Sequence, residues 1–298
     1  MSEGRLRVPG DGRLRILYNN RVARAGTDIR ATSAATPARR VGQVRPGRKW
    51  RAAAPGRQVL WIDFGARVAA THGAILGHNL GVAGNLRWTV TDDPAAETDP
   101  DGTANTLDLT TRPWDPAYGL GFDPFGESLG GFPDLSDFAA FPARKVVDYG
   151  GQVRARYLRI EIFDPLLAVP VEAGVVLHGQ GFEPADNIAF GWSVEWRDPA
   201  EQIETEGGLL AAPAGKPRRA ASFALDHLRR EAALFTVDDL NRIAGLRRPV
   251  LVELWAGADQ ATDYRTAVYG LFTDIEPVTH ADPLAYAAGW TVQELPDG

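Results

Sequence analysis

Short segments in which apolar residues alternate with polar ones recur along this chain. Residues 59–64, 86–91 and 157–162 each place large apolar side chains on one face and polar or charged ones on the other. A period of two residues is typical of half-buried antiparallel strands, whose inner face packs while the outer face meets water. The pattern therefore predicts an all-β fold.

The C-terminal half shows the same alternation, with one helical interruption. Residues 188–196 carry five bulky apolar side chains at alternate positions, which predicts a strand whose bulky face is buried. One helix is expected from an N-cap at Thr236 to a stop at Gly245. Other strands are expected at residues 14–18, 221–228, 250–255, 266–272 and 290–295.

The length and turn content favour two β-sandwich domains. The chain has 298 residues, of which 32 are Gly and 21 are Pro, a composition that suits short strands joined by turns. We expect a flexible arm at 1–12, a first sandwich at 13–165, and a second sandwich with the one helix at 166–298.

A long insertion, residues 92–145, interrupts the first predicted domain. It is rich in Asp, Pro, Gly and Phe, and an insertion of this length in a compact domain marks a functional loop or an interaction arm. Its aromatic residues are too numerous for a disordered loop. They are expected to pack either on the parent sandwich or on a neighbouring subunit, and we expect Phe122, Phe125 and Phe132 to form an assembly interface.

Charge is distributed unevenly along the chain, although the net charge is only −6. Residues 1–60 hold 14 basic and 3 acidic residues, whereas residues 61–165 hold 8 and 15, and residues 166–298 hold 10 and 20. Basic and acidic ends favour contact between neighbouring copies, and a solvated arginine-rich surface is the alternative. Nucleic-acid binding is not expected, because the basic segment lacks helical periodicity and interleaved aromatic residues.

Several motifs in the first predicted domain occur in a recognisable order. The sequence Arg48-Lys49-Trp50 is followed by an alternating strand at 61–65, by residues 73–80, and by a closing strand at 155–162. This arrangement resembles the discoidin-like, or galactose-binding-like, jelly roll. The chain departs from that family in its insertion at 92–145 and in having no cysteine pair.

A second resemblance concerns the whole chain. The segment 75–80 reads Ile-Leu-Gly-His-Asn-Leu and precedes a second sandwich that contains the segments 191–199 and 247–252. In this form the chain is similar to tail-tip and baseplate proteins of long-tailed bacteriophages and related gene-transfer particles. The resemblance implies a protein that extends or decorates a tail tip, forms symmetric rings or trimers, and contacts host surface glycans.

No catalytic or metal-binding motif in the sequence is specific enough to indicate a function. Gly126-Glu127-Ser128-Leu129-Gly130 matches a hydrolase pattern but lacks the strand and helix that the motif requires. Residues 97–108 approach a calcium loop without its first Asp, its final Glu or flanking helices, so calcium stays an open alternative to a solvated acidic loop. The five histidines show no zinc-ligand spacing. We therefore expect that the chain is not an enzyme and that it has no cofactor and no metal site.

Four residues are candidates for sugar binding. The ring of Trp50 suits stacking on a pyranose, while Arg48, His78 and Asn79 offer hydrogen bonds to its hydroxyls. The alternative is structural, because such a Trp fills cores and a Gly-His-Asn turn bonds its own backbone.

The expected function follows from the second resemblance. It implies a structural component of a virion tail tip or baseplate that assembles with identical copies, as a trimer or hexamer, and with other phage tail proteins. The alternatives are a glycan-binding receptor adhesin and, less favoured, a glycan-cleaving tail enzyme. No signal peptide or membrane insertion is expected, so the chain is expected to fold in a host cytoplasm. The resemblance implies the virion tail as its final location.

Overall fold

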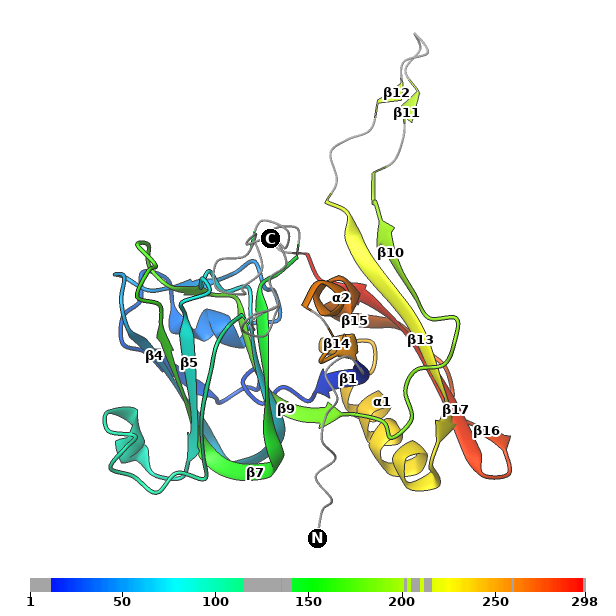
Figure 1. Cartoon of the computed structure of the whole chain (residues 1–298), viewed down its shortest axis with the longest axis horizontal. Coiled ribbons are helices and arrows are strands. Elements are labelled where there is room, and N and C mark those ends of the chain that lie inside the picture. The colour runs from blue at the N-terminus through cyan, green and yellow to red at the C-terminus, as the bar shows by residue number, and fades with distance from the viewer. Residues whose placement is uncertain are drawn as a thin grey trace, which may run out of the picture.

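The computed structural model describes residues 12–114, 135, 141–200, 203–204, 210–211, 216–258 and 260–296. Strands dominate, which confirms the predicted all-β class. Two halves lie side by side and are joined where strands β9 and β1 meet (Figure 1). In the described part of the chain, no helix has both the length and the apolar character needed to cross a membrane.

The first unit is built around two long, bent strands that pair with each other. Its strands are β2 (Asp28–Ala31), β3 (Trp50–Arg51), β4 (Gln58–Leu76), β5 (Asn85–Thr91), β6 (Leu107–Thr111), β7 (Arg144–Phe163), β8 (Glu172–Ala173) and β9 (Val175–Phe182), with 3₁₀ turns η1 (Ala38–Gly42) and η2 (Pro94–Glu97). The alternating residues predicted to face inward do so: Leu60, Ile62, Trp88 and Ile160 are fully buried in one cluster.

The second unit packs a sheet against one helix. Its elements are β1 (Arg13–Tyr18), β10 (Ser193–Arg197), β13 (Arg218–Leu228), a π-helical segment η5 (Ala232–Val237), α1 (Asp238–Ala244), β14 (Val250–Ala256), α2 (Gln260–Thr266), β15 (Ala267–Ile275), β16 (Thr279–Asp282) and β17 (Ala285–Glu294). Leu240 of α1 is buried against the sheet, and Asn241 accepts a hydrogen bond from the Trp290 indole at 2.8 Å. Beyond β10 and β13, the short strands β11 (Ile203–Glu204) and β12 (Leu210–Ala211) stand away from both units (Figure 1).

One sheet runs through both units in the order β10-β13-β17-β15-β14-β1-β9-β4-β7-β5-β6. Strand β1 was expected in the first sandwich, yet it pairs with β14, and its residues Leu14 and Ile16 lie in the core of the second unit. Strand β9 follows the predicted boundary, yet it pairs with β4 of the first unit. Long-range pairing decides both placements, and local periodicity carries no information about it.

Two local predictions were wrong. Only residues 193–196 of the segment 188–196 lie in a strand, β10, because Gly191 turns the chain with a φ of 97°. The bulky face is only partly buried: Ile188, Trp192 and Val194 pack on the second core, whereas Phe190 is fully exposed and Trp196 is 54% exposed. The helical region begins before Thr236, which lies inside it, whereas Gly245 ends it as predicted.

The described part of the expected insertion is not structureless. Strand β6 lies within it and pairs along β5, and η2 is capped by Asp93, whose side chain accepts from the backbone of Ala95 at 2.9 Å. Strand β7 begins at Arg144, just inside the expected end. The assembly candidates Phe122, Phe125 and Phe132, and the pattern at 126–130, lie outside the described residues.

Buried ion pairs join the two units. Arg144 at the start of β7 contacts Glu253 of β14 at 3.3 Å and Asp263 of α2 at 2.7 Å. Its guanidinium lies 4.2 Å from the centre of the Tyr264 ring. Arg15 of β1 reaches the other oxygen of Glu253 at 3.3 Å. Removing one member would leave the others buried without an opposite charge, which destabilises the fold.

We expect Arg144→Met to lower the free energy of unfolding by about 3–5 kcal/mol, because it leaves Glu253 and Asp263 buried with fewer partners. Urea unfolding followed by tryptophan fluorescence measures the change. The matched control is Arg197→Met, which removes an exposed pair with Glu195 and should be close to neutral. Equal stability of the two variants would contradict a structural role for the Arg144 network.

Candidate functional site: an arginine-lined groove

The predicted sugar-binding residues have structural partners. Trp50 is fully buried, and its indole donates to the backbone oxygen of Ser33 at 3.3 Å, so no ring face is open to a ligand. The Asn79 amide donates to Pro170 at 2.9 Å and accepts from the backbone of Glu172 at 2.8 Å. Trp50 therefore fills the core of the first unit and Asn79 closes a loop, as the alternative interpretation held.

The other two predicted residues do not complete a site either. His78 is 5% exposed, and burial lowers its pKa to about 3, so it stays neutral. Its ring meets the edge of Trp114. Arg48 is exposed on the loop before β3. With three of the four side chains buried or hydrogen-bonded internally, these residues form no common surface for a sugar.

One arginine binds two carboxylates of the acidic loop at 97–108. Arg87 of β5 forms hydrogen bonds with both Asp101 and Asp108. Asp99 accepts from the backbone of Gly102 at 3.0 Å. These carboxylates are held by protein donors and do not converge on one point, as calcium would require.

A wide bulge in β4 creates a groove on the first unit. Asp63 pairs with Tyr157 and Val68 with Ala155, so four residues of β4 bulge out opposite one residue of β7. Gly65 makes the turn with a φ of 74°, and its amide donates to Asp63 at 2.7 Å. The bulge is one wall of the groove. Bulges re-aim side chains in this way at binding sites.

Two salt links fix the bulge. Arg156, the residue opposite, grips Asp63 with two hydrogen bonds of 2.9 and 2.8 Å, which holds the pKa of Asp63 below its ordinary 3.8. Asp92 accepts from the Arg67 guanidinium at 2.9 Å and from the backbone of Arg156 at 3.1 Å. The bulge is thus anchored to β7 and to the end of β5.

The groove has a volume of about 420 Å³ and a strongly basic lining. Among the residues that line it are four arginines: Arg21 and Arg24 from the loop after β1, Arg67 from the bulge, and Arg154 from β7. No acidic residue of the described chain is part of the lining. A cavity of this size falls in the range of small-ligand sites.

The positive charge in the groove is poorly compensated. Arg24 bonds only a neutral partner, the Asn19 amide oxygen at 3.0 Å, and the buried Nε of Arg21 has no hydrogen-bond partner within the described chain. Burial, together with the neighbouring Arg24 and Arg248, lowers the pKa of Arg21 from its ordinary 12.5. Like charges gathered without counterions cost folding stability, so the arrangement favours an anionic ligand.

An aromatic side chain completes the groove. Phe64 of the bulge lines it and stacks on the buried His178 ring at 5.0 Å. Because His178 holds one face of Phe64, the ring is fixed in place. Arginine forks bind carboxylates and sulfates in bidentate geometry, and a fixed aromatic ring packs against an apolar ring face. The combination suits a ring-shaped anion.

The comparisons with known proteins concern the fold. No protein-family model matches this sequence, and no curated protein matches it. Among solved structures, it resembles CpGH89CBM32-6 produced by Clostridium perfringens, with 12% identity over 54% of this chain and 98% of that chain and a TM-score of 0.34.

Two further likenesses are of the same strength. Chitosan-binding module 1 of a chitosanase/glucanase from Paenibacillus sp. IK-5 has 11% identity over 54% of this chain and 98% of that chain, with a TM-score of 0.35. The lectin domain of lectinolysin, complexed with Lewis B antigen, has 12% identity over 54% and 96%, with a TM-score of 0.35. At such scores, the residues of this chain have to carry any argument about its ligand.

The groove residues were missed by sequence reasoning. The excess of arginine in residues 1–60 was the available signal, and Arg21 and Arg24 belong to that segment. Arg67 is the one arginine of β4 and Arg154 is one of several in β7, and the β4–β7 pairing brings these two to the same place. A further group that could hold a metal, His72 with Asp148 and Glu183, was also missed.

We expect Asp63→Ala to loosen the bulge, because it removes both the Arg156 grip and the acceptor for the Gly65 amide. Hydrogen exchange of the Gly65 amide should quicken several-fold. In the wild type, ionised Asp63 contributes fully to the free energy of unfolding above its ordinary pKa of 3.8. That contribution is lost as the pH falls through the lower pKa of Asp63 in the folded chain. Unchanged exchange would show that Asp63 does not hold the bulge.

Proposed function

We propose that this chain is a glycan-binding protein that recognises an acidic sugar in the arginine-lined groove. The observation that carries the proposal is the cluster of four arginines around one cavity that no acidic side chain of the described residues enters. Uronic, sialic and sulfated sugars share the required chemistry, a ring that bears an anionic group. A glycan-binding adhesin was the alternative function expected from the sequence, with different residues at the site.

The roles of the side chains follow from their positions. Arg21 lines the groove, so its guanidinium offers charged donors to a ligand, and its buried Nε has no hydrogen-bond partner among the described residues. Arg24 and Arg154 flank the same cavity and have no acidic partner within the described chain, which leaves their charge for the ligand. Arg67 is already paired with Asp92, and it serves to hold the bulge as much as to bind.

Screening the purified chain on a glycan array tests the proposal directly. We expect retention of acidic glycans over neutral ones, with binding that weakens as salt increases, because charge-assisted contacts are screened. Salt-insensitive binding to neutral glycans, or no binding to any glycan at micromolar protein, would overturn the proposal.

We expect Arg154→Gln and Arg24→Gln each to weaken binding of the best array ligand roughly tenfold or more, since a charge-assisted hydrogen bond contributes about 1.5–3 kcal/mol. Isothermal titration calorimetry measures the affinity, and circular dichroism checks the fold. The matched control is Arg230→Gln, an exposed arginine on the second unit. An equal loss of affinity in the control would point to a general charge effect instead of a site.

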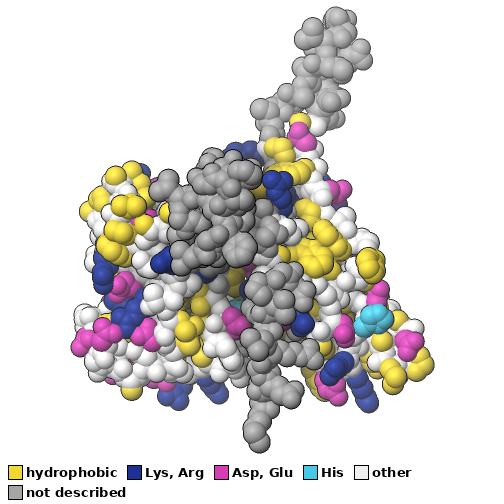
Figure 2. All heavy atoms as spheres, viewed as in Figure 1, with side chains coloured by type: hydrophobic (Ala, Val, Ile, Leu, Met, Phe, Trp, Pro, Cys, Tyr) yellow, Lys and Arg dark blue, Asp and Glu magenta, His cyan; other side chains and the backbone are white. Residues whose placement is uncertain are grey.

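A second candidate function is assembly into a larger particle such as a phage tail tip. The β10–β13 ribbon supports it, because it extends beyond the body, and large apolar side chains gather on the visible face of the second unit (Figure 2). The exposed side chains of the second unit include Phe190, which precedes β10, and Trp196 of β10. Exposed apolar surface of this kind suits contact with another protein.

If the ribbon is an assembly surface, the chain should form a symmetric oligomer and Trp196→Ser should shift it towards the monomer. Light scattering measures the mass. Leu284→Ser is the control, because Leu284 is 89% exposed on the turn before β17. A wild-type chain that stays monomeric would remove self-assembly through this ribbon, and mass spectrometry of intact particles would decide virion membership.

A further inference from the structure

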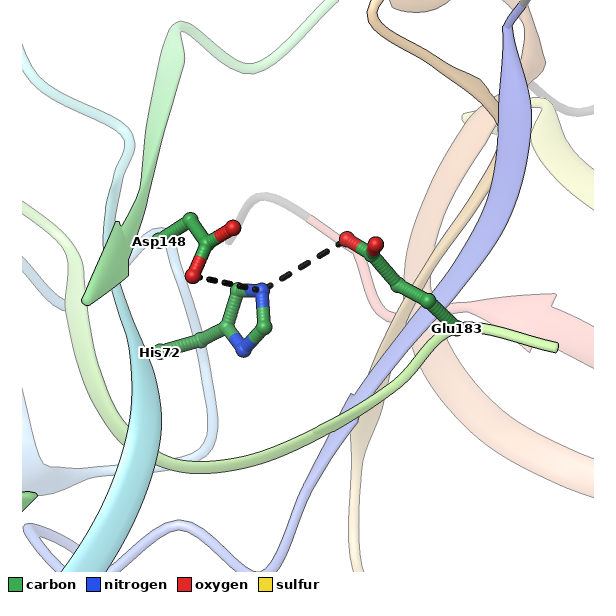
Figure 3. A group of neighbouring side chains, drawn as sticks. All are labelled: His72, Asp148 and Glu183. Carbon is green, nitrogen blue, oxygen red and sulfur yellow. Dashed lines mark ion pairs between the residues drawn. The ribbon is translucent and has the colours of Figure 1, made fainter. Parts of the chain in front are cut away.

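Three side chains from separate strands converge at the junction of the two units. His72 lies in β4, Asp148 in β7, and Glu183 directly after β9 (Figure 3). The His72 Nε2 atom lies 3.8 Å from an Asp148 oxygen and 3.6 Å from a Glu183 oxygen. All three donor atoms lie within 4.8 Å of one another.

The imidazole of His72 points its free nitrogen at the two carboxylates. The side chain is 7% exposed, and its buried Nε2 has no hydrogen-bond partner in the described chain, because both oxygens are too far for one. A buried polar nitrogen without a partner is costly. An ion between these groups would satisfy it.

The other ring nitrogen of His72, Nδ1, has a hydrogen-bond partner. His72 Nδ1 lies 2.9 Å from the Thr71 hydroxyl, which accepts from the Gly181 amide at 2.7 Å. A side chain at Gly181 would collide with the ring, since an added Cβ would lie 2.2 Å from Nδ1. Metal-bound histidines are oriented in this way, with the second nitrogen fixed by a neighbouring group.

We propose that His72, Asp148 and Glu183 bind a divalent transition-metal ion of the Zn²⁺ class. One imidazole nitrogen and two carboxylate oxygens suit such ions, whereas Ca²⁺ requires a shell of six to eight oxygens. Bonds of about 2.0 Å place tetrahedral ligand atoms about 3.3 Å apart, so the carboxylate oxygens at 3.8 and 3.6 Å from His72 Nε2 need to move only a few tenths of an ångström towards it. The widest separation within the group, at most 4.8 Å, has to close further. A fourth position is left for water or a ligand.

The neighbouring Arg15 does not prevent binding. Its Nε donates to Glu183 at 2.6 Å, but a carboxylate oxygen has two lone pairs and can hold a metal as well. Arg15 also pairs with Glu253, so its charge is shared between two carboxylates. The Asp148 side chain is 39% exposed, which gives an ion a route to the site.

Titration of the metal-free, untagged chain with ZnCl₂ by calorimetry tests the proposal. We expect one ion per chain and a rise in the melting temperature on binding. Asp148→Asn and His72→Gln should each weaken the affinity at least tenfold. His227→Gln is the matched control, because His227 is an exposed histidine outside the cluster, and it should bind as the wild type does.

Titration with CoCl₂ gives an independent signature. Visible absorption bands of protein-bound cobalt should appear in the wild type and in the control, and should be lost in Asp148→Asn. Asp148→Asn keeps the test valid if His72→Gln fails to fold, because Asp148 is partly exposed. No ion bound at millimolar ZnCl₂, or equal affinity in Asp148→Asn and the wild type, would overturn the proposal.

Discussion

Buried charge at the junction of the two units is the interaction on which the rest of the structure depends. Arg15 and Arg144 share Glu253, and their further partners Glu183 and Asp263 come from opposite ends of the network. Each ion is stable away from water only because its partner is present. The units therefore have one relative placement, in which β1 lies between β14 and β9.

That placement also sets the geometry of the sites. The loop after β1 brings Arg21 and Arg24 against the bulge of β4, so the groove exists only while β1 stays in the sheet. Glu183 follows β9 at the same junction and faces His72 from there. The arginine-lined groove and the His72 cluster thus both draw residues from the β4–β7 pair and from segments next to the β1–β9 junction.

The sequence predicted those features of the fold that depend only on residues close together along the chain. Alternation located the inner faces of β4, β5 and β7 correctly, because the two-residue period is a property of each strand alone. It failed at residues 188–196, where Gly191 turns the chain and no layer covers Phe190. Alternation indicates a ribbon with two faces, and only the tertiary structure decides whether a face is covered.

The candidate sites were beyond local reasoning for the same reason. The groove joins arginines that are far apart in the sequence, and His72, Asp148 and Glu183 show no motif spacing. Of the residues predicted to bind sugar, Trp50 packs in the core and Asn79 holds a loop. Their chemistry suits a ligand, but their donors and acceptors are already used.

The position of β1 has a consequence for how the chain acquires its structure. Ile16 lies opposite Val252, so this pairing closes a loop of most of the polypeptide. During synthesis β1 emerges early and then waits for β14, while the β4–β7 ribbon can form in the meantime. Contacts of such high sequence separation slow folding. Both neighbours of β1 come later in the chain, so the edges of β9 and β14 stay open to wrong partners until β1 pairs with them.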